Sequence, residues 1–119
     1  MSINIQVYED IKSGFANSNT QLIAVSKTKP VADIEALYAL GQRDFGENYV
    51  QELVEKQAQL PSDIRWHFIG HLQSNKVKYI ASFVHLIHGV DSLSLLKEIN
   101  KQAIKCDRNI DCLLQIHIA

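Results

Sequence analysis

The stretch Leu22-Ile23-Ala24-Val25-Ser26-Lys27-Thr28-Lys29-Pro30 places a lysine directly after a run of strand-forming residues. Four apolar residues, two of them β-branched, precede small polar residues and a proline, which cannot continue a hydrogen-bonded ladder. The pattern predicts a fully buried β-strand that ends near Ser26. Because side chains alternate along a strand, Lys27 is expected to leave it on the same face as Ile23 and Val25.

This predicted position of Lys27 suits covalent chemistry. A primary amine that is poorly hydrated beside apolar neighbours is more readily neutral, and a neutral amine can attack a carbonyl carbon. The stretch is therefore typical of a lysine that forms a Schiff base. The alternative is a solvated lysine in a loop between a strand and a helix, since lysine side chains are mostly exposed.

The composition is that of one ordinary globular domain. The 119 residues are 46% hydrophobic and 21% charged, which is enough to bury a core. Twelve basic and thirteen acidic residues give a net charge of −1, and no basic cluster with interleaved aromatics indicates a nucleic-acid partner. The lysine stripe at 97, 101 and 105 is interpreted as the solvated face of a helix.

Location and redox state follow from two further features of the sequence. No apolar run approaches the ~20 residues of a membrane span, and the amino terminus lacks a signal-peptide pattern, so we expect a cytoplasmic protein with no membrane partner. Cys106 and Cys112 are too few for a disulfide framework and are predicted to be free thiols.

Strand-like and helix-like segments alternate along the chain. The predicted strands cover residues 22–26, 43–45, 65–69, 84–90 and 112–118. Apolar spacing predicts a first helix over residues 3–16. Later helices are expected to carry the apolar faces Ile34, Leu37 and Tyr38; Val50, Leu53, Val54 and Ala58; Val77, Ile80 and Ala81; and Leu95, Leu96, Ile99 and Ala103. Gly41 is expected to end the second helix in a left-handed conformation, and Ser74 to cap the fourth.

This alternation indicates right-handed βαβ crossovers and a parallel sheet, so the fold class is α/β. The pattern does not separate an open doubly wound sheet from a (β/α) barrel, although no glycine-rich nucleotide-binding loop is present. Lys27, Asn48 and the segment 70–76 all follow the carboxyl ends of predicted strands. That edge of the sheet is where α/β folds carry their sites.

The other histidines favour structural roles. His67, in mid-strand beside Trp66 and Phe68, is predicted to be a core residue with satisfied hydrogen bonds. His85 and His88 lie three apart on a predicted strand, so alternation places them on opposite faces and predicts no metal site.

Three blocks of the sequence resemble one family. They are residues 24–30 (AVSKTKP), 45–52 (FGENYVQE) and 66–76 (WHFIGHLQSNK), with weaker matches at 89–92 and 113–116. In this order and spacing they resemble the pyridoxal phosphate homeostasis protein family over essentially the whole chain. The resemblance implies a fold like the barrel domain of alanine racemase. That domain is a (β/α)8 TIM barrel that holds pyridoxal 5′-phosphate (PLP) as an internal aldimine on a lysine.

The resemblance also implies roles for individual residues. By position it assigns the Schiff base to Lys27 and not to Lys29, and it makes Asn48 a polar contact of the cofactor. His71 and Asn75 are further cofactor-binding candidates, with a structural hydrogen bond as the alternative role for His71. It implies no catalytic residue and no metal ligand.

The chain departs from the family pattern at two points. Near the end of the fifth predicted strand this chain has Gln115-Ile116-His117, whereas the family typically has Gln-(Val/Ile)-Asn. An imidazole therefore replaces an amide at the third position of this motif. The chain also has roughly half the length of a family member, and five predicted strands in place of eight. Residues 1–119 are therefore expected to form a single domain of about the first five βα units, a partial barrel truncated at its C-terminal side. It is either a fragment or a naturally short protein.

Together these observations predict a PLP-binding protein of intracellular vitamin B6 homeostasis, without robust catalysis. One alternative is a fold-type III PLP-dependent enzyme such as an amino-acid racemase, which needs an acid/base group on each face of the cofactor. The other is a partial barrel that binds nothing. The expected partners are PLP and PLP-dependent apoenzymes. A homo-oligomer is expected if the chain folds alone, because a partial barrel has unpaired strand edges.

Overall fold

The computed structural model describes residues 3–118, which form five parallel strands alternating with helices. The elements are α1 (Ile5–Ser13), β1 (Ala24–Val25), α2 (Val31–Ala39), β2 (Asp44–Glu47), α3 (Val50–Gln59), β3 (Arg65–Phe68), the 3-10 helix η1 (Ser74–Tyr79), β4 (Leu86–Val90), α4 (Leu93–Lys105) and β5 (Asp111–Leu114). No helix in this range is long and apolar enough to cross a membrane.

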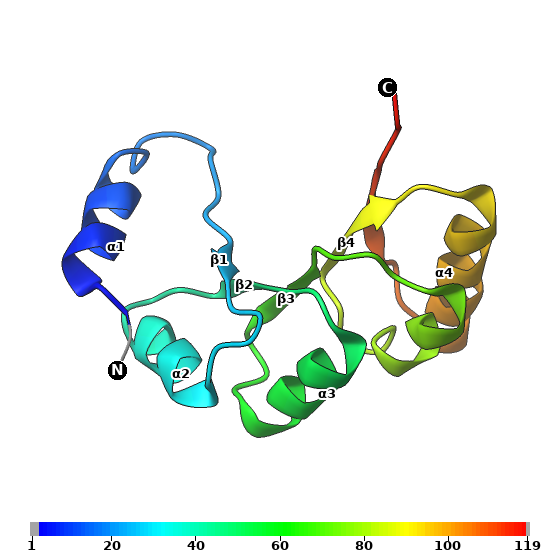
Figure 1. The fold of residues 1–119 in the computed structure, drawn as a ribbon, viewed down its shortest axis with the longest axis horizontal. Coiled ribbons are helices and arrows are strands. Elements are labelled where there is room, and N and C mark those ends of the chain that lie inside the picture. The colour runs from blue at the N-terminus through cyan, green and yellow to red at the C-terminus, as the bar shows by residue number, and fades with distance from the viewer. Residues whose placement is uncertain (1–2, 119) are drawn as a thin grey trace.

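The order of the strands decides between the two α/β architectures. Neighbouring strands follow the chain as β1-β2-β3-β4-β5, and every pair is parallel. A doubly wound sheet reverses its strand order at a switch point, whereas a (β/α) barrel does not. In Figure 1, α2, α3 and α4 follow one another along one side of the sheet. The sheet is therefore a partial barrel, as expected.

The core lies between the sheet and these helices. Phe45, Trp66 and Ile87 point from three adjacent strands into this layer, where they are almost completely buried. The rings of Phe45 and Trp66 pack with centroids 6.1 Å apart. Leu53 of α3 and Leu95 of α4 close the layer from the other side. Burial of each of these large side chains contributes about 1.5–3 kcal/mol relative to an exposed position.

The first strand differs from the prediction. It is only two residues long, and it is not fully buried, because Val25 is 55% exposed. The helices cover one face of the sheet only, so alternation buries Ser26 against them and leaves Val25 on the uncovered face. Lys27 follows the strand and is exposed.

The predicted helix after Ser74 is a short 3-10 helix instead, and Gln73 occupies its N-cap position without a side-chain hydrogen bond. Its buried residue Val77 and its buried C-cap residue Ile80 are three apart, which matches the 3-residue period of a 3-10 helix. Gly41 has the predicted left-handed conformation, with φ of 103°, directly after the C-cap residue of α2.

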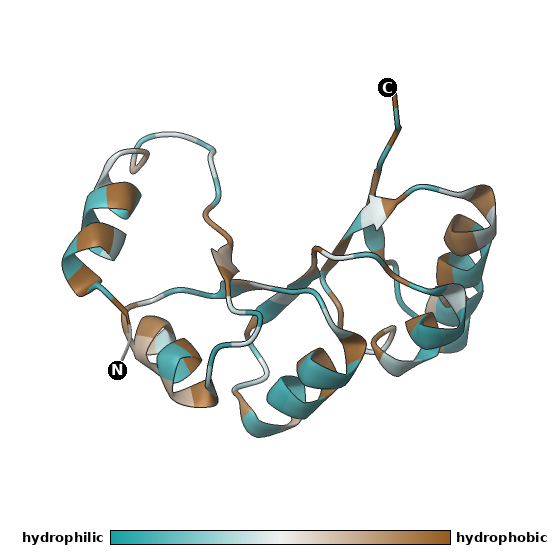
Figure 2. Ribbon diagram, in the orientation of Figure 1, coloured by the Kyte–Doolittle hydropathy of each residue, from teal (hydrophilic) through white to brown (hydrophobic). Residues whose placement is uncertain are grey.

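The two ends of the described chain keep apolar residues in contact with solvent. Figure 2 shows hydrophobic residues on α1 and along the segment after β5. On α1 only Tyr8 is buried, where its hydroxyl donates to Gln42 Oε1 at 2.9 Å, while Val7 and Ile11 are exposed. The last strand ends at Leu114 and not at Ile118, and Ile116 beyond it is 78% exposed. The predicted helix and strand patterns at 3–16 and 112–118 were therefore too long.

Two strand predictions had different bounds: β2 begins one residue later and ends two residues later than the predicted 43–45, and β4 begins two residues later than the predicted 84–90. Three further sequence predictions on this fold are confirmed. The lysine stripe at 97, 101 and 105 is exposed on α4, and Cys106 and Cys112 are free thiols. His67 is 1% exposed, and both of its ring nitrogens have hydrogen-bond partners.

Candidate functional site

The loop that carries Lys27 connects β1 to α2 at the carboxyl edge of the sheet. It forms a tight turn in which the Lys29 N–H donates to the Ser26 carbonyl at 3.0 Å. Thr28 has φ of 62°, a left-handed conformation that β-branched residues rarely adopt. Among the described residues, the Lys27 side chain makes no hydrogen bond or ion pair. The turn therefore presents a free amine at this edge.

Strand pairing brings the polar ends of three strands together. Val25 of β1 lies opposite Gly46 of β2, and Glu47 of β2 lies opposite Phe68 of β3. The ladder continues past the strand ends, since the Ser26 N–H donates to Gly46 O and the Ile69 N–H to Glu47 O, each at 2.9 Å. This register places Lys27, Asn48 and Ile69 at about the same level of the three strands, and Gly70 follows Ile69.

Asn48 has an unusual environment at this edge. Its Oδ1 atom is buried and has no hydrogen-bond partner among the described residues. Gly70 approaches it so closely that a Cβ atom on Gly70 would lie 2.7 Å from the Asn48 carbonyl oxygen. Only a glycine fits at this position, and the close approach holds the end of β2 against the loop after β3. An unpaired buried amide oxygen can accept a hydrogen bond from a bound ligand.

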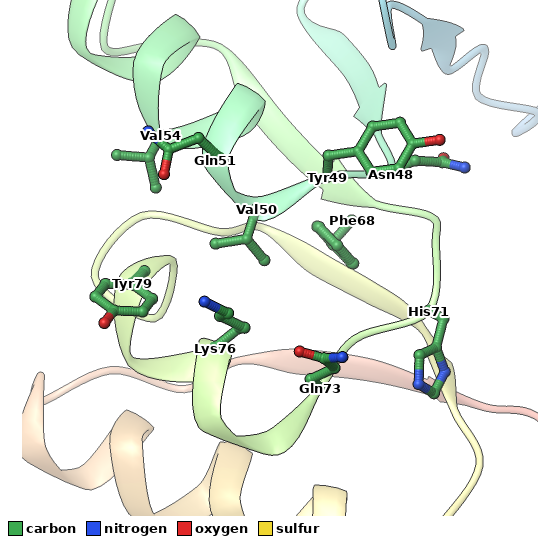
Figure 3. Close-up of a pocket in the computed structure, with 10 residues that line it drawn as sticks. All are labelled: Asn48, Tyr49, Val50, Gln51, Val54, Phe68, His71, Gln73, Lys76 and Tyr79. Carbon is green, nitrogen blue, oxygen red and sulfur yellow. The ribbon is translucent and has the colours of Figure 1, made fainter.

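A hollow of about 570 Å³ opens beside Asn48, between α3 and η1 (Figure 3). This is the size of a small-molecule site. Its lining residues are Asn48, Tyr49, Val50, Gln51, Val54, Phe68, His71, Gln73, Lys76 and Tyr79. Lys76 Nζ lies 5.7 Å from the centroid of the Tyr79 ring, and this ammonium gives the hollow a cation.

The four predicted cofactor-binding residues share one edge of the sheet but not one pocket. Asn48 and His71 line the hollow, and His71 is exposed. Lys27 is on the neighbouring loop, and Asn75 is exposed on η1, where it does not line the hollow. The hollow is also lined by Gln73, Lys76 and Tyr79, which were not predicted as cofactor-binding residues, although Gln73 and Lys76 stand in the block 66–76.

A buried polar network beneath the Lys27 loop was also missed. Glu47 is completely buried on β2, and its Oε2 accepts from Ser26 Oγ at 2.5 Å and from Lys56 Nζ at 2.8 Å. Lys56 also donates to Glu52 Oε2 at 2.7 Å. From the sequence, Glu52 and Lys56 are an ordinary pair four residues apart on a helix, and such pairs usually lie in solvent. Burial raises the pKa of Glu47, although the hydrogen bonds from Lys56 and Ser26 act to lower it.

A second polar cluster lies on the uncovered face of the sheet. Asp44 Oδ1 is 2.9 Å from His67 Nε2, and His67 Nδ1 is 3.0 Å from His88 Nε2. Arg65 donates to both oxygens of Asp44, at 2.9 and 2.7 Å. Burial acts to raise the pKa of Asp44, but the hydrogen bonds from Arg65 and His67 hold it below its usual value. Burial lowers the pKa of His67 and of His88.

The prediction that His85 and His88 face opposite sides was wrong. Their ring centroids lie 5.3 and 5.2 Å from that of His67. His85 precedes β4, so strand alternation does not apply to it. Asp44, His67 and His85 offer atoms within 4.8 Å of one another, a spacing that a metal ion could bridge. Because the Arg65 guanidinium already occupies both oxygens of Asp44 and repels a cation, we assign no metal to this cluster.

Comparisons with known proteins agree on one family. The family model described as the alanine racemase N-terminal domain matches residues 5–118. The chain is 42% identical over 99 residues to the pyridoxal phosphate homeostasis protein of Pseudomonas aeruginosa, covering 82% of this chain and 43% of that protein. It is 41% identical over 114 residues to the protein of the same name from Synechocystis, covering 94% and 52%.

Solved structures give the same result. PipY of Synechococcus elongatus with PLP bound matches with a TM-score of 0.88 at 40% identity, over 96% of this chain and 54% of PipY. PipY without PLP matches with a TM-score of 0.89 over the same shares. The chain thus spans about half the length of the relatives it matches.

Proposed function

The chain belongs to the alanine racemase N-terminal domain family, and on that premise we propose that it binds PLP in intracellular PLP homeostasis, without robust catalysis. Residues 1–119 act as one PLP-binding domain. Lys27 Nζ would hold PLP covalently, because PLP supplies an aldehyde that condenses with a neutral primary amine; the two amine hydrogens and the aldehyde oxygen would leave as water. Asn48 and His71 supply polar contacts to PLP from the lining of the hollow, and Asn75 supplies a polar contact from outside it.

The observation that carries this proposal is the strand register. It brings the free amine of Lys27 and the unpaired Oδ1 of Asn48 out of adjacent strands at one level. PLP presents a ring hydroxyl that could donate to that oxygen. Lys76 offers a cation for a phosphate. The residues present therefore fit PLP, which supplies an aldehyde and an electron-withdrawing ring when bound.

The test is to map the site of attachment. The protein is mixed with PLP, reduced with borohydride, digested and analysed by mass spectrometry. The pyridoxyl mass is expected on Lys27, and Lys27→Ala is expected to abolish the Schiff-base absorbance. Lys29→Ala is the matched control, because Lys29 is an exposed lysine of the same turn. Modification of Lys29 or Lys76 in place of Lys27, or none at all, would overturn the proposal.

Two further assays separate the alternatives. Turnover of an amino acid by the loaded protein would favour a racemase-like enzyme. Transfer of PLP to a PLP-dependent apoenzyme, measured as recovered activity of that enzyme, would support delivery.

We expect the 119-residue chain to bind PLP more weakly than a full-length relative, because phosphate is usually held by backbone N–H groups and the relatives have further segments that could supply them. Comparable affinity in a parallel titration would contradict this.

Assembly and location complete the proposal. β1 and β5 are the edges of the sheet, and we propose that they pair with a second copy or with further chain. Sedimentation across a dilution series is the test, and a monomer that resists dilution would contradict pairing between copies. We place the function in the cytoplasm, where the two free thiols would stay reduced.

A further inference from the structure

The two peptide groups that flank Lys27 are both held by side chains of α3. The Ser26 carbonyl, which belongs to the peptide group before Lys27, accepts from Lys56 Nζ at 2.7 Å. The Thr28 N–H, which belongs to the peptide group after Lys27, donates to Glu52 Oε2 at 2.7 Å. Both contacts bridge more than twenty positions of sequence. They fix the backbone of Lys27 while its own side chain stays free.

Glu47 holds this arrangement from below. Its Oε2 accepts hydrogen bonds from Lys56 Nζ and from the Ser26 hydroxyl. The Lys56 ammonium therefore lies between the carboxylates of Glu47 and Glu52 and forms an ion pair with each. Glu47 and Lys56 are 0% and 5% exposed, respectively. A charge in such a position must keep its partners, since an unpaired buried charge is very unfavourable. The ammonium of Lys56 therefore has one geometry, and the loop carbonyl that it binds shares that rigidity.

Thr28 gives a reason for this support. Its left-handed backbone is a conformation that persists in a non-glycine residue only where neighbours enforce it. The hydrogen bond to Glu52 acts on the N–H of that same residue. If the bond were lost, the turn could relax to a more common conformation and carry Lys27 away from the end of β1.

We infer that Glu47, Glu52 and Lys56, hereafter the Lys27 clamp, are positioning residues that set the direction in which the Lys27 amine meets its aldehyde. The inference rests on the proposed function of Lys27. None of the three residues touches the bound ligand in this scheme. They act through the Ser26 carbonyl and the Thr28 N–H.

The test compares two glutamates of the same helix. Glu52→Ala removes the acceptor of the Thr28 N–H and one of the two carboxylate partners of Lys56, so both arms of the clamp are weakened. Glu55→Ala removes only an exposed hydrogen bond from Gln51 on α3. Alanine is a good helix former, so neither change disturbs the helix itself. We expect Glu52→Ala to slow PLP attachment to Lys27 about tenfold or more, because misplacement by about 1 Å can cost up to a hundredfold. Glu55→Ala is expected to stay within about twofold of the unmodified protein.

Hydrogen exchange supplies a readout that does not depend on PLP. The Thr28 amide is expected to lose protection in Glu52→Ala and to keep it in Glu55→Ala. Glu52→Gln retains an acceptor oxygen, so it is expected to restore most of that protection and part of the rate. Equal rates and equal Thr28 exchange in the two alanine variants would overturn the clamp. If the unmodified protein fails to attach PLP, the proposed function fails, and Thr28 exchange alone then decides whether the clamp exists.

Discussion

Strand β2 carries two buried carboxylates, one on each face of the sheet, and the two are stabilised in different ways. Glu47 faces α3, is closed off from solvent and shares the single ammonium of Lys56 with Glu52. Asp44 faces the uncovered side, where it binds the half-exposed guanidinium of Arg65 and the imidazole of His67. The helices cover one face of the sheet and exclude solvent from the Glu47–Lys56 pair on that face, whereas the Asp44–Arg65 pair on the uncovered face stays in contact with solvent.

The largest effect is expected where the sealed pair is broken. Lys56→Met keeps most of the apolar stem but leaves Glu47 without its cation. Removing one partner of a buried pair costs about 3–5 kcal/mol, so the free energy of unfolding in urea is expected to fall by that amount. A loss below about 1 kcal/mol would show that Glu47 is not left as an unpaired buried charge, because it takes up a proton or is reached by water.

The matching change on the uncovered face is expected to cost much less. Arg65→Met removes the guanidinium from Asp44, but His67 stays as a hydrogen-bond donor and solvent can reach the site. We expect a loss of about 1 kcal/mol in the same urea titration. A loss equal to that of Lys56→Met would remove the distinction between the two faces.

The two faces should also respond differently to acid. Burial lowers the pKa of His67 and of His88, so the folded protein binds fewer protons than the unfolded chain just below pH 6.5. The stability contributed by neutral His67 and His88 is fully present above pH 6.5. It is lost as the pH falls from 6.5 toward the lowered pKa values that these two histidines have in the folded protein. The slope is at most about 1.4 kcal/mol per pH unit for each proton. Urea titrations at pH 7.5 and 5.5 measure it.

The control for this pH effect is His88→Asn, which should reduce the slope, and an unchanged slope would count against the assignment.

At lower pH the carboxylates add opposite contributions. The pKa of Asp44 is held down, so its contribution is lost as pH falls through its folded value. Burial raises the pKa of Glu47, so its ionisation weakens the fold as pH rises above its unfolded value of about 4.3.

The smallest effect is expected at the turn itself. Thr28→Gly removes the steric cost of the left-handed conformation but increases the entropy of the unfolded chain, so stability should change by less than about 1 kcal/mol. Thermal unfolding measures this difference. A loss well above that size would mean that the threonine side chain supports the turn in its own right.

Much of the candidate site was accessible from the sequence because it follows strand ends. Lys27, Asn48 and His71 each lie within three residues of the carboxyl end of a strand, and parallel strands meet at one edge. Their roles toward PLP stay predictions. The polar clusters were not accessible, because Lys56 and Glu52 look like a solvent-exposed helix pair, and because His85 lies just outside the strand whose alternation was used to place it.

The sequence by itself determined the alternation of strands and helices, the parallel sheet and the edge that carries the polar residues. These properties follow from local periodicity and from turn residues, which act over a few positions. The tertiary structure decided the unreversed strand order, the single covered face and the burial of Lys56 against Glu47. Each of these depends on segments distant in sequence meeting in one register, and side-chain spacing within a segment carries no information about that meeting.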